Sequence, residues 1–529
     1  MSHKNSSSEY DVVVAGGGHN ALVTAGYLSK AGLSVLVLES RDVIGGNTTT
    51  EELTLPGFKH DSCSSAHVLI QNSPLIKRNE LHLDRYGLSY IKPDVVASMP
   101  FLDGHNLTMY KDMEKTVSEI EKYSIKDARE YRKLLSDWSE VAPIYAEERL
   151  NPPRKEGGVM KMYESLKDGE EWLRIRMKSS KEVIEERFEE EHVRAFLGWM
   201  AFQTVQPIIR KNTGFLAFSL VSGRQTHSWT LPRGGSIQLP YALQRFIEER
   251  GGRVILSSHV NRVLVENGRA VGFETSDGRQ FFARRACVSS IHVKELVKMV
   301  DRDQIPEDFE RSVKNWRVGV TLFVTHYALS EAPKYSSENG GHVVSGTGGA
   351  AESLENLSRA CSLTDQGELE YDTPPLLLVC PTVSDPSRAP QGKHTYKVIA
   401  FVTATPRKGS WDDLKEGYSR AIEEYLSKIT RNFGNSIILG RVVESPLDLF
   451  RRNPANWGGS CHGGDMASDQ NGIFRPSLRW SNYRLFIPGL YQTGSCTHPG
   501  GSVSAGPGRN AAKVLLEDLG YDFEKVASS

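Results

Sequence analysis

The chain opens with runs of apolar residues whose lengths and spacing predict a βαβ unit. Residues 10–15 (YDVVVA) form a largely apolar run typical of a buried parallel strand. Residues 21–31 carry small and apolar side chains at helical spacing, and Gly32 ends that helix. Residues 33–38 (LSVLVL) predict a second buried strand, joined to the helix by a very short connection.

The middle of the chain changes character twice. Between about residues 112 and 225, long charged stretches with amphipathic spacing, such as residues 127–150, predict a helical insertion rather than continued alternation of strand and helix. Residues 253–288 then predict a β-meander, because strand-like segments are separated by dipeptides such as Asn267-Gly268 that suit tight hairpin turns.

The rest of the chain mixes both kinds of element. Strands and one long helix are predicted at residues 318–326, 376–379, 396–403 and 411–431. The last fifty residues return to the first pattern, with a short strand at 490–493, a glycine-rich loop, and a helix that begins at Pro507. Proline suits the first turn of a helix.

A glycine-rich turn lies between the first strand and the first helix. Residues 16–21 (GGGHNA) match G-x-G-x-x-[GA], and the flanking strand and helix make this weak pattern specific. Gly16 permits the tight turn, Gly18 lets backbone amides approach a pyrophosphate at the positive helix end, and Ala21 allows close helix packing. The motif predicts a dinucleotide-binding site.

An acidic residue and a second glycine pair refine this prediction. Glu39 ends the second strand, where a carboxylate can accept hydrogen bonds from an adenosine ribose. FAD-binding and NAD-binding proteins share this arrangement, so the residues of the next loop must distinguish between the two cofactors. Gly45 and Gly46 allow that loop to fold back against the diphosphate and ribityl parts of FAD. The sequence has no second G-x-G-x-x-G between a strand and a helix, which disfavours a tandem FAD and NAD reductase.

The glycine-rich loop near the C-terminus supplies the other half of the predicted site. Residues 494–503 lie between a short strand and a helix. Backbone amides and a helix N-terminus aimed at the flavin ring would stabilise the negative charge of its reduced form. The alternative is a strand, turn and helix that only pack.

Composition and charge narrow the class of protein. A chain of 529 residues predicts two intertwined domains, and 64 basic against 65 acidic side chains predict no nucleic-acid partner. Six cysteines without a C-x-x-C spacing argue against a disulfide framework or a redox-active dithiol, and favour a cytoplasmic location. The first ten residues are too polar for a secretory signal, and no apolar run predicts a membrane span, although peripheral membrane contact stays open.

Catalytic residues are harder to select, because hydride transfer to a flavin depends largely on geometry and needs no strong base. His462 and His498 lie in glycine-rich loops and are candidates for proton transfer, with a structural role as the alternative for each. No metal is predicted, because neither Cys461-His462 nor Cys496-Thr497-His498 has the spacing of paired ligands.

Two groups in the helical insertion have an ordinary interpretation and a functional one. The aromatic residues Trp199, Phe202, Phe215 and Phe218 can line an apolar tunnel, but ordinary core is the expectation. The charged residues Asp127, Arg129 and Arg132 are expected on a solvated helix face.

Taken together, the chain resembles the phytoene desaturase-like family of FAD-dependent oxidoreductases, and within it the carotenoid ketolase and pyridine nucleotide-disulfide oxidoreductase domain-containing branch. Matching segments include GGGHNALVTAGYLSKAG at 16–32, ESRDVIGGNTTTEE at 39–52, LPRGGSIQLPYAL at 231–243 and THPGGSVSAGPGRNAA at 497–512. The resemblance implies an α/β fold of the amine oxidase and phytoene desaturase type. A Rossmann-type FAD-binding domain is interleaved with a mixed α+β substrate domain that carries a helical insertion.

The resemblance also implies domain boundaries and cofactor contacts. A discontinuous FAD-binding domain is expected at residues 1–80, 226–300 and 480–529, and a substrate-binding domain at 81–225 and 301–479. The motifs and the resemblance assign FAD contacts to Gly16, Gly18, His19, Asn20, Ala21, Glu39, Ser40, Arg41, Gly45, Gly46, Asn47, Val260, Gly494, Gly501, Ser502 and Val503. Ser495 stands where related flavoenzymes often have an acidic residue, so the contact there is expected to be weaker or made by backbone.

The activity implied by the resemblance is that of a dehydrogenase or desaturase. It would remove hydride from a largely apolar organic substrate and pass the electrons to oxygen, a quinone or another acceptor. A flavin oxidase, a monooxygenase or a cofactor-assisted isomerase is the alternative on the same fold. Prenyl-protein escort proteins share the architecture without catalysis, and the intact fingerprint with Glu39 argues against that class.

Overall fold

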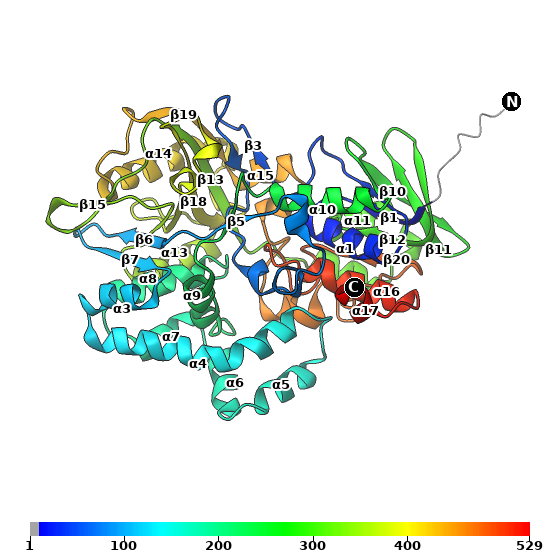
Figure 1. Cartoon of the computed structure of the whole chain (residues 1–529), viewed down its shortest axis with the longest axis horizontal. Coiled ribbons are helices and arrows are strands. Elements are labelled where there is room, and N and C mark those ends of the chain that lie inside the picture. The colour runs from blue at the N-terminus through cyan, green and yellow to red at the C-terminus, as the bar shows by residue number, and fades with distance from the viewer. Residues whose placement is uncertain (1–9) are drawn as a thin grey trace.

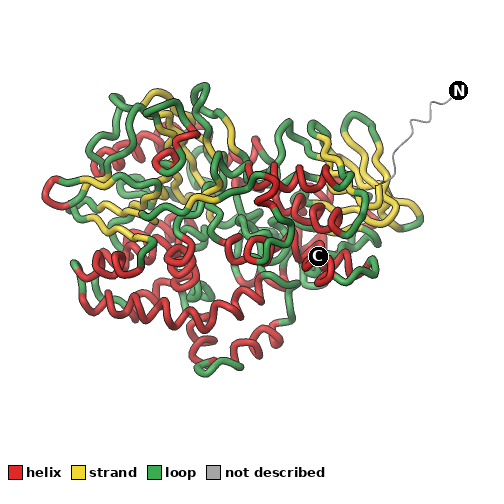
Figure 2. Tube along the Cα trace, in the orientation of Figure 1, coloured by secondary structure: helices red, strands yellow, loops and turns green. Residues whose placement is uncertain are grey.

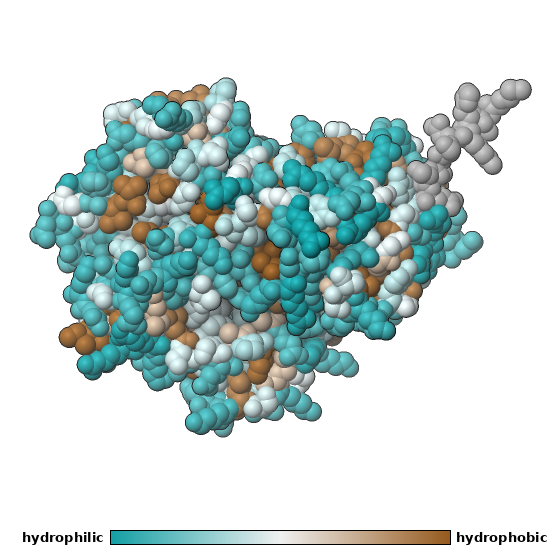
Figure 3. All heavy atoms as spheres, viewed as in Figure 1, coloured by the Kyte–Doolittle hydropathy of each residue, from teal (hydrophilic) through white to brown (hydrophobic). Residues whose placement is uncertain are grey.

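The computed structural model describes residues 10–529, so residues 1–9, which carry most of the expectation about a secretory signal, lie outside the described residues. Two seven-stranded sheets organise this part of the chain and lie on opposite sides of Figure 1. On the face shown in Figure 3, hydrophobic residues form scattered small patches within a mostly hydrophilic surface.

The first sheet has a parallel core of five strands in the order β20, β12, β1, β2, β9. Their bounds are β1 (Tyr10–Ala15), β2 (Val35–Leu38), β9 (Arg253–Ile255), β12 (Gln280–Ser289) and β20 (Leu490–Gln492). The N-terminal half of β12 leaves this core and pairs with the antiparallel strands β11 (Arg269–Thr275) and β10 (Val260–Glu266). Segments far apart in sequence thus share one sheet.

Both faces of the parallel core are covered, which explains why its strands are continuous apolar runs. Val12 and Val14 face α1 (His19–Lys30), α10 (Gln238–Glu249), α16 (Gly506–Asp518) and α17 (Phe523–Ser528). Val13 and Ala15 face the opposite side, where α11 (Val293–Leu296) and α12 (Glu307–Lys314) pack. Figure 1 shows α16 and α17 beside α1, so the two ends of the described chain meet in this domain.

The second sheet runs in the order β19, β13, β18, β17, β16, β6, β7. Its strands are β6 (Val95–Pro100), β7 (Asn106–Tyr110), β13 (Val320–Leu329), β16 (Thr347–Ala350), β17 (Leu376–Val379), β18 (His394–Thr403) and β19 (Ile438–Glu444). One face packs on α14 (Trp411–Ile429), and the other face packs on the helical insertion. The sheet is therefore a layer between two sets of helices.

The helical insertion lies along the lower edge of the molecule in Figure 2. It consists of α3 (Met113–Glu121), α4 (Ile125–Arg149), α5 (Glu156–Glu164), α6 (Gly169–Met177), α7 (Ser180–Arg187), α8 (Glu191–Phe202) and α9 (Leu216–His227). Besides short 3₁₀ turns, the other elements are α2 (Pro74–Lys77), α13 (Leu354–Asp365), α15 (Pro446–Arg452) and the paired strands β3 (Thr50–Glu51), β4 (His60–Asp61), β5 (Tyr90–Ile91), β8 (Leu231–Pro232), β14 (Tyr335–Ser336) and β15 (His342–Val343). None of the helices in residues 10–529 combines the length and apolar character needed to cross a bilayer.

Of the two expectations for the helical insertion, the one for the aromatic residues is confirmed and the one for Asp127 is not. Trp199, Phe202, Phe215 and Phe218 are buried in the largest core cluster, so the ordinary interpretation of these aromatic residues is confirmed. The expectation for Asp127 is wrong. Its side chain is fully buried and accepts the backbone N–H groups of Glu189 and Glu190 at 3.0 and 2.9 Å, because the loop before α8 needs a partner for these amides. Arg129 on the same helix is exposed.

Candidate cofactor-binding and active site

A cavity of about 400 Å³ lies between the two sheets, at the carboxyl ends of β1 and β2. Ligands of open α/β sheets bind at this edge, because the loops that follow the strands diverge there. Every residue to which the sequence assigned an FAD contact lines this cavity: Gly16, Gly18, His19, Asn20, Ala21, Glu39, Ser40, Arg41, Gly45, Gly46, Asn47, Val260, Gly494, Gly501, Ser502 and Val503. The individual contacts with a cofactor stay predictions.

The glycine turn leaves room for a bound group beside α1. Gly18 is the N-cap of α1 and has no side chain to cap the helix, and the first turn of α1 carries no acidic residue. A Cβ atom on Gly18 would meet no protein atom within 4 Å, whereas one on Gly16 would lie 2.3 Å from Oγ of Ser290. The free amides and the open space fit a pyrophosphate at the positive end of the helix.

Glu39 joins the turn to the second strand. Its buried carboxylate accepts the backbone N–H of Gly17 at 2.6 Å and that of Arg41 at 2.9 Å. Oγ of Ser40 donates to the same carboxylate at 3.1 Å, and because an ionised carboxylate has about four acceptor positions, it can still accept a ribose hydroxyl of a dinucleotide. These backbone bonds hold the carboxylate in place at the cavity wall.

Polar atoms without a protein partner point to a polar ligand at this end of the cavity. Nδ1 of His19 lies 3.1 Å from Oγ1 of Thr48, while its Nε2 atom and Oδ1 of Asn20 are buried and lack hydrogen-bond partners in the described part of the chain. Burial lowers the pKa of His19 to about 4, so its ring is neutral at pH 7. Buried polar groups are normally paired, and a bound dinucleotide fits as the missing partner.

The two candidate catalytic histidines differ in position. His462 lines the cavity, with Nδ1 3.5 Å from Oγ of Ser502, and burial together with Arg475 lowers its pKa to about 4. Its ring is therefore neutral and a weak base at pH 7, and proton uptake at His462 stays a prediction. His498 does not belong to the cavity wall. Its Nε2 atom lies 2.9 Å from the carbonyl oxygen of Glu148, which is the position of a structural residue.

The opposite end of the cavity is mainly apolar. Leu322 of β13, Leu377 of β17 and the β18 residues Ile399 and Phe401 line it from the second sheet. Val68, Leu69, Val205 and Leu220 line it from the connecting loops and from α9. The helical insertion and the later mixed region thus both contribute to this wall.

Arg224 of α9 is a charged exception in the apolar wall, and sequence analysis did not single it out. The side chain is buried over the ring of Trp229, with Cζ 4.1 Å from the ring centroid, and donates to Oε1 of Gln203. Its Nε and Nη1 atoms are buried without a hydrogen-bond partner in residues 10–529. Burial lowers its pKa to about 9, so the group stays cationic at pH 7.

Two cysteine side chains also meet at the cavity wall. Cys63 and Cys461 both line it, and the neighbouring thiol of Cys461 lowers the pKa of Cys63. The spacing of cysteines in the sequence gave no sign of this pair, because the two residues are 398 positions apart and only the fold brings them together. All six cysteines are free thiols in the described residues.

Comparison with known proteins agrees with this geometry. The model of the flavin containing amine oxidoreductase family matches residues 22–512. A limonene dehydrogenase polypeptide of Castellaniella defragrans is 28% identical over 97% of this chain and 95% of its own. Mouse pyridine nucleotide-disulfide oxidoreductase domain-containing protein 2 is 27% identical over 97% and 94%, and the lycopene-forming phytoene desaturase of Pseudescherichia vulneris is 23% identical over 96% and 99%.

The fold is shared more widely. A solved structure of a putrescine oxidase variant superimposes with a TM-score of 0.61 at 15% identity, covering 97% of this chain and 99% of that chain, which shows the fold alone. The chain belongs to the flavin containing amine oxidoreductase family. It is an FAD-dependent oxidoreductase that acts on an organic substrate, and its resemblance to phytoene desaturases is confirmed.

Proposed function

We propose that this enzyme is a dehydrogenase or desaturase that removes hydride from a largely apolar organic substrate. The apolar wall opposite the glycine turn carries the proposal, because a site lined by Leu322, Leu377 and Phe401 favours apolar over charged molecules. The names of two relatives, limonene dehydrogenase and phytoene desaturase, specify hydrocarbon substrates and support the same class.

Different residues would bind the cofactor, orient the substrate and take up a proton in such a reaction. The free amides of α1 would bind the cofactor pyrophosphate, and Glu39 would bind its ribose. FAD, when bound, supplies the hydride acceptor. The apolar wall excludes water and orients the substrate C–H bond, and the neutral ring of His462 is placed to take up a proton.

Arg224 refines the proposed substrate. A buried guanidinium with two unpaired donor atoms needs an acceptor, and a substrate oxygen would satisfy it. We therefore propose a substrate that is apolar over most of its length and carries an oxygen-containing group at one end.

The proposed electron acceptor is oxygen, a quinone or another acceptor, and the alternative is a flavin oxidase, monooxygenase or isomerase. Anaerobic mixing of the holoenzyme with apolar alcohols, amines and polyenes beside small charged acids tests the substrate class. Apolar compounds should bleach the flavin absorbance. Bleaching by charged acids alone, or rapid bleaching by NADPH alone, would contradict the proposal, and reoxidation by oxygen beside a quinone identifies the acceptor.

We also propose domain boundaries and a cellular location for this protein. The strands of the first sheet support a discontinuous FAD-binding domain at residues 1–80, 226–300 and 480–529, with the substrate-binding domain at 81–225 and 301–479. The free cysteines support a cytoplasmic location, since disulfides are rare in reducing compartments. Cell fractionation with thiol counting tests the second proposal.

A further inference from the structure

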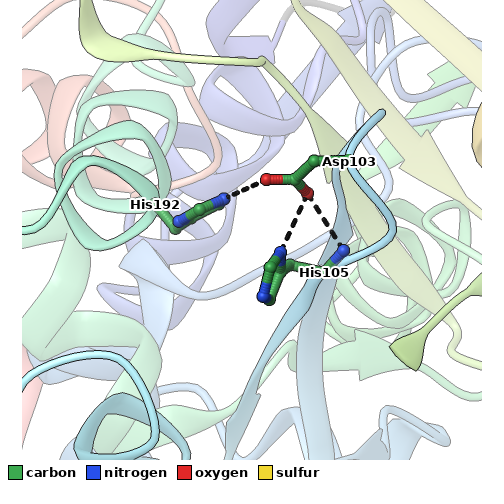
Figure 4. Close-up of side chains that lie close together, drawn as sticks. All are labelled: Asp103, His105 and His192. Atoms are coloured by element: carbon green, nitrogen blue, oxygen red, sulfur yellow. Dashed lines mark hydrogen bonds and ion pairs between the residues drawn. The ribbon is translucent and has the colours of Figure 1, made fainter. Parts of the chain in front are cut away.

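A cluster of two histidines and an aspartate lies at the edge of the second sheet, outside the cofactor cavity. Asp103 and His105 belong to the turn between β6 and the edge strand β7, and His192 belongs to the first turn of α8. One ligand atom from each side chain lies within 4.8 Å of the others. Figure 4 shows the carboxylate of Asp103 between the two imidazole rings.

The distances suit a small cation. Oδ2 of Asp103 lies 2.8 Å from Nε2 of His192, and Oδ1 lies 3.1 Å from Nδ1 of His105. Ligand atoms about 2.0–2.1 Å from a tetrahedral Zn²⁺ are about 3.3 Å apart. The two distances from Asp103 to the histidine nitrogens are within 0.5 Å of this value, and rotation of the exposed side chains of Asp103 and His105 would bring the three ligand atoms around one ion.

The two ligand nitrogens face Asp103, and an ion would take the place of these contacts. Nδ1 of His105 is screened from solvent, and its contact with Oδ1 of Asp103 at 3.1 Å lacks the geometry of a hydrogen bond. The side chains of Asp103 and His105 are 50% and 45% exposed, so an ion can enter and water can complete its coordination. Two imidazoles with one carboxylate favour Zn²⁺ and similar first-row transition ions over Mg²⁺ or Ca²⁺, which prefer oxygen ligands.

A second layer of contacts fixes His192. Its Nδ1 atom lies 2.7 Å from Oε1 of Glu190, and the other oxygen of Glu190 accepts the N–H of Val193 at 2.9 Å. Metal-binding histidines usually make such a bond to a carboxylate, which orients the ring and its free nitrogen. The buried Asp127 holds the backbone of Glu190 in turn, so the orientation of His192 is built into the fold before any ion binds.

The turn that carries the other two ligands is also held. Asp103 accepts the N–H of His105 at 3.0 Å, and the N–H of Phe101 donates to the carbonyl oxygen of His105 at 3.0 Å. The ring of Phe101 packs edge-on against His192, with 4.6 Å between the ring centroids. Both halves of the cluster therefore start in fixed positions, which lowers the entropy cost of binding an ion.

We propose that Asp103, His105 and His192 form a Zn²⁺ site that ties the turn between β6 and β7 to the N-terminus of α8. Glu190 is its positioning residue. None of the three ligands lines the cofactor cavity, so the ion stabilises the substrate-side sheet and takes no part in hydride transfer.

The test uses the FAD-loaded enzyme after removal of bound metal with a chelator and dialysis. Zn²⁺ binding is followed by competition with a chromogenic zinc chelator, and thermal unfolding is followed by flavin fluorescence. The wild type should bind one Zn²⁺ per chain and unfold at a higher temperature with Zn²⁺ than with Mg²⁺. His105→Ala and Asp103→Asn should each weaken binding at least tenfold, and Glu190→Gln should weaken it by about ten- to a hundredfold.

His342→Ala is the matched control, because His342 is an exposed histidine on β15 that does not belong to the cluster. It should keep wild-type affinity for Zn²⁺. His105→Ala lies in an exposed turn, so normal folding of this variant is checked by an unchanged flavin spectrum. Wild-type affinity in His105→Ala and Asp103→Asn, or no binding by the wild type, would overturn the site. Flavin reduction by substrate does not enter the readout, so the proposed function and the metal site fail independently.

Discussion

The backbone N–H of Gly17 donates to the carboxylate of Glu39 over 2.6 Å, and this bond ties the turn after β1 to the end of β2. The predicted pyrophosphate site and the predicted ribose site are therefore one connected unit. A change at Glu39 alters both, because its carboxylate supports the glycine turn and faces the cavity at the same time.

Glu39→Ala should weaken FAD binding by about 1–3 kcal/mol, the scale of hydrogen bonds to a charged group. The substitution also leaves the N–H groups of Gly17 and Arg41 without their acceptor. Titration of the apoenzyme with FAD, followed by quenching of flavin fluorescence, measures the effect. Glu39→Gln keeps the shape and is expected to lose less affinity. Wild-type affinity in Glu39→Ala would show that the ribose is held elsewhere.

Gly18→Val should give a folded but colourless protein. A Cβ atom at Gly18 meets no protein atom within 4 Å, so the added side chain occupies the space beside α1 rather than disturbing the core. Absorbance near the flavin bands and circular dichroism separate cofactor loss from unfolding. Gly417→Val is the control, since Gly417 is exposed on α14 with open space around it and should stay yellow. A yellow Gly18→Val protein would place the pyrophosphate away from α1.

Arg224→Met should selectively impair substrates that carry an oxygen-containing group. The variant keeps an unbranched side chain against Trp229 but removes the cation, and a hydrogen bond to a charged group accounts for about 1.5–3 kcal/mol, or roughly ten- to a hundredfold in kcat/KM. Steady-state kinetics with matched substrates, with and without the oxygen, measure the ratio. Arg129→Met, at an exposed position, should leave kcat/KM unchanged for both substrates. An equal loss of kcat/KM on both substrates would show that Arg224 has a packing role and does not bind the substrate oxygen.

Acidification should destabilise the holoenzyme below about pH 6.5. Burial lowers the pKa of His19 and His462 to about 4 in the folded state, whereas an unfolded histidine titrates near 6.5. The stabilising effect of each neutral ring is complete above about pH 6.5 and is lost as the pH falls through the folded pKa near 4, by on the order of 3 kcal/mol per ring. Thermal unfolding between pH 7.5 and 4 should show a falling Tm, and replacing both rings with asparagine should make this fall smaller, because other buried histidines such as His67 and His292 also have a lowered pKa. A Tm independent of pH in the wild type would contradict the burial of these rings as neutral groups.

Bound FAD should protect Cys63 from alkylation, because this residue lines the cavity that the cofactor is expected to enter and its pKa is lowered. Mass spectrometry after brief treatment with N-ethylmaleimide should find Cys63 modified in the apoenzyme and protected in the holoenzyme, whereas Cys461, whose pKa is raised, should react little in either form. Cys287, which is buried in the first sheet core, serves as the internal reference for unfolding. Equal labelling of Cys63 with and without FAD would show that bound FAD does not cover this residue.

Much of the first sheet could be predicted from the sequence because its signals are local. The boundaries of β1 match the expected strand, and α1 begins only two residues before the predicted helix, at His19 rather than Ala21. Gly16, Gly18 and Ala21 line the cavity, since a strand, a glycine turn and a helix fix their own geometry within about twenty residues, whereas the distant Val260 was assigned by the family resemblance.

The tertiary structure decided the features that depend on distant residues. Asp127 has the sequence context of a solvated helix, and only the approach of Glu189 and Glu190 makes it a buried acceptor. Arg224 belongs to an ordinary helical segment until the second sheet closes an apolar wall around it. The sequence determined the cofactor half of the site, because short-range backbone geometry forms it. The substrate wall, the Cys63 and Cys461 pair, and the contact between His105 and His192 depend on long-range packing. Side-chain periodicity specifies which face of an element is buried, but it does not specify which partner covers that face.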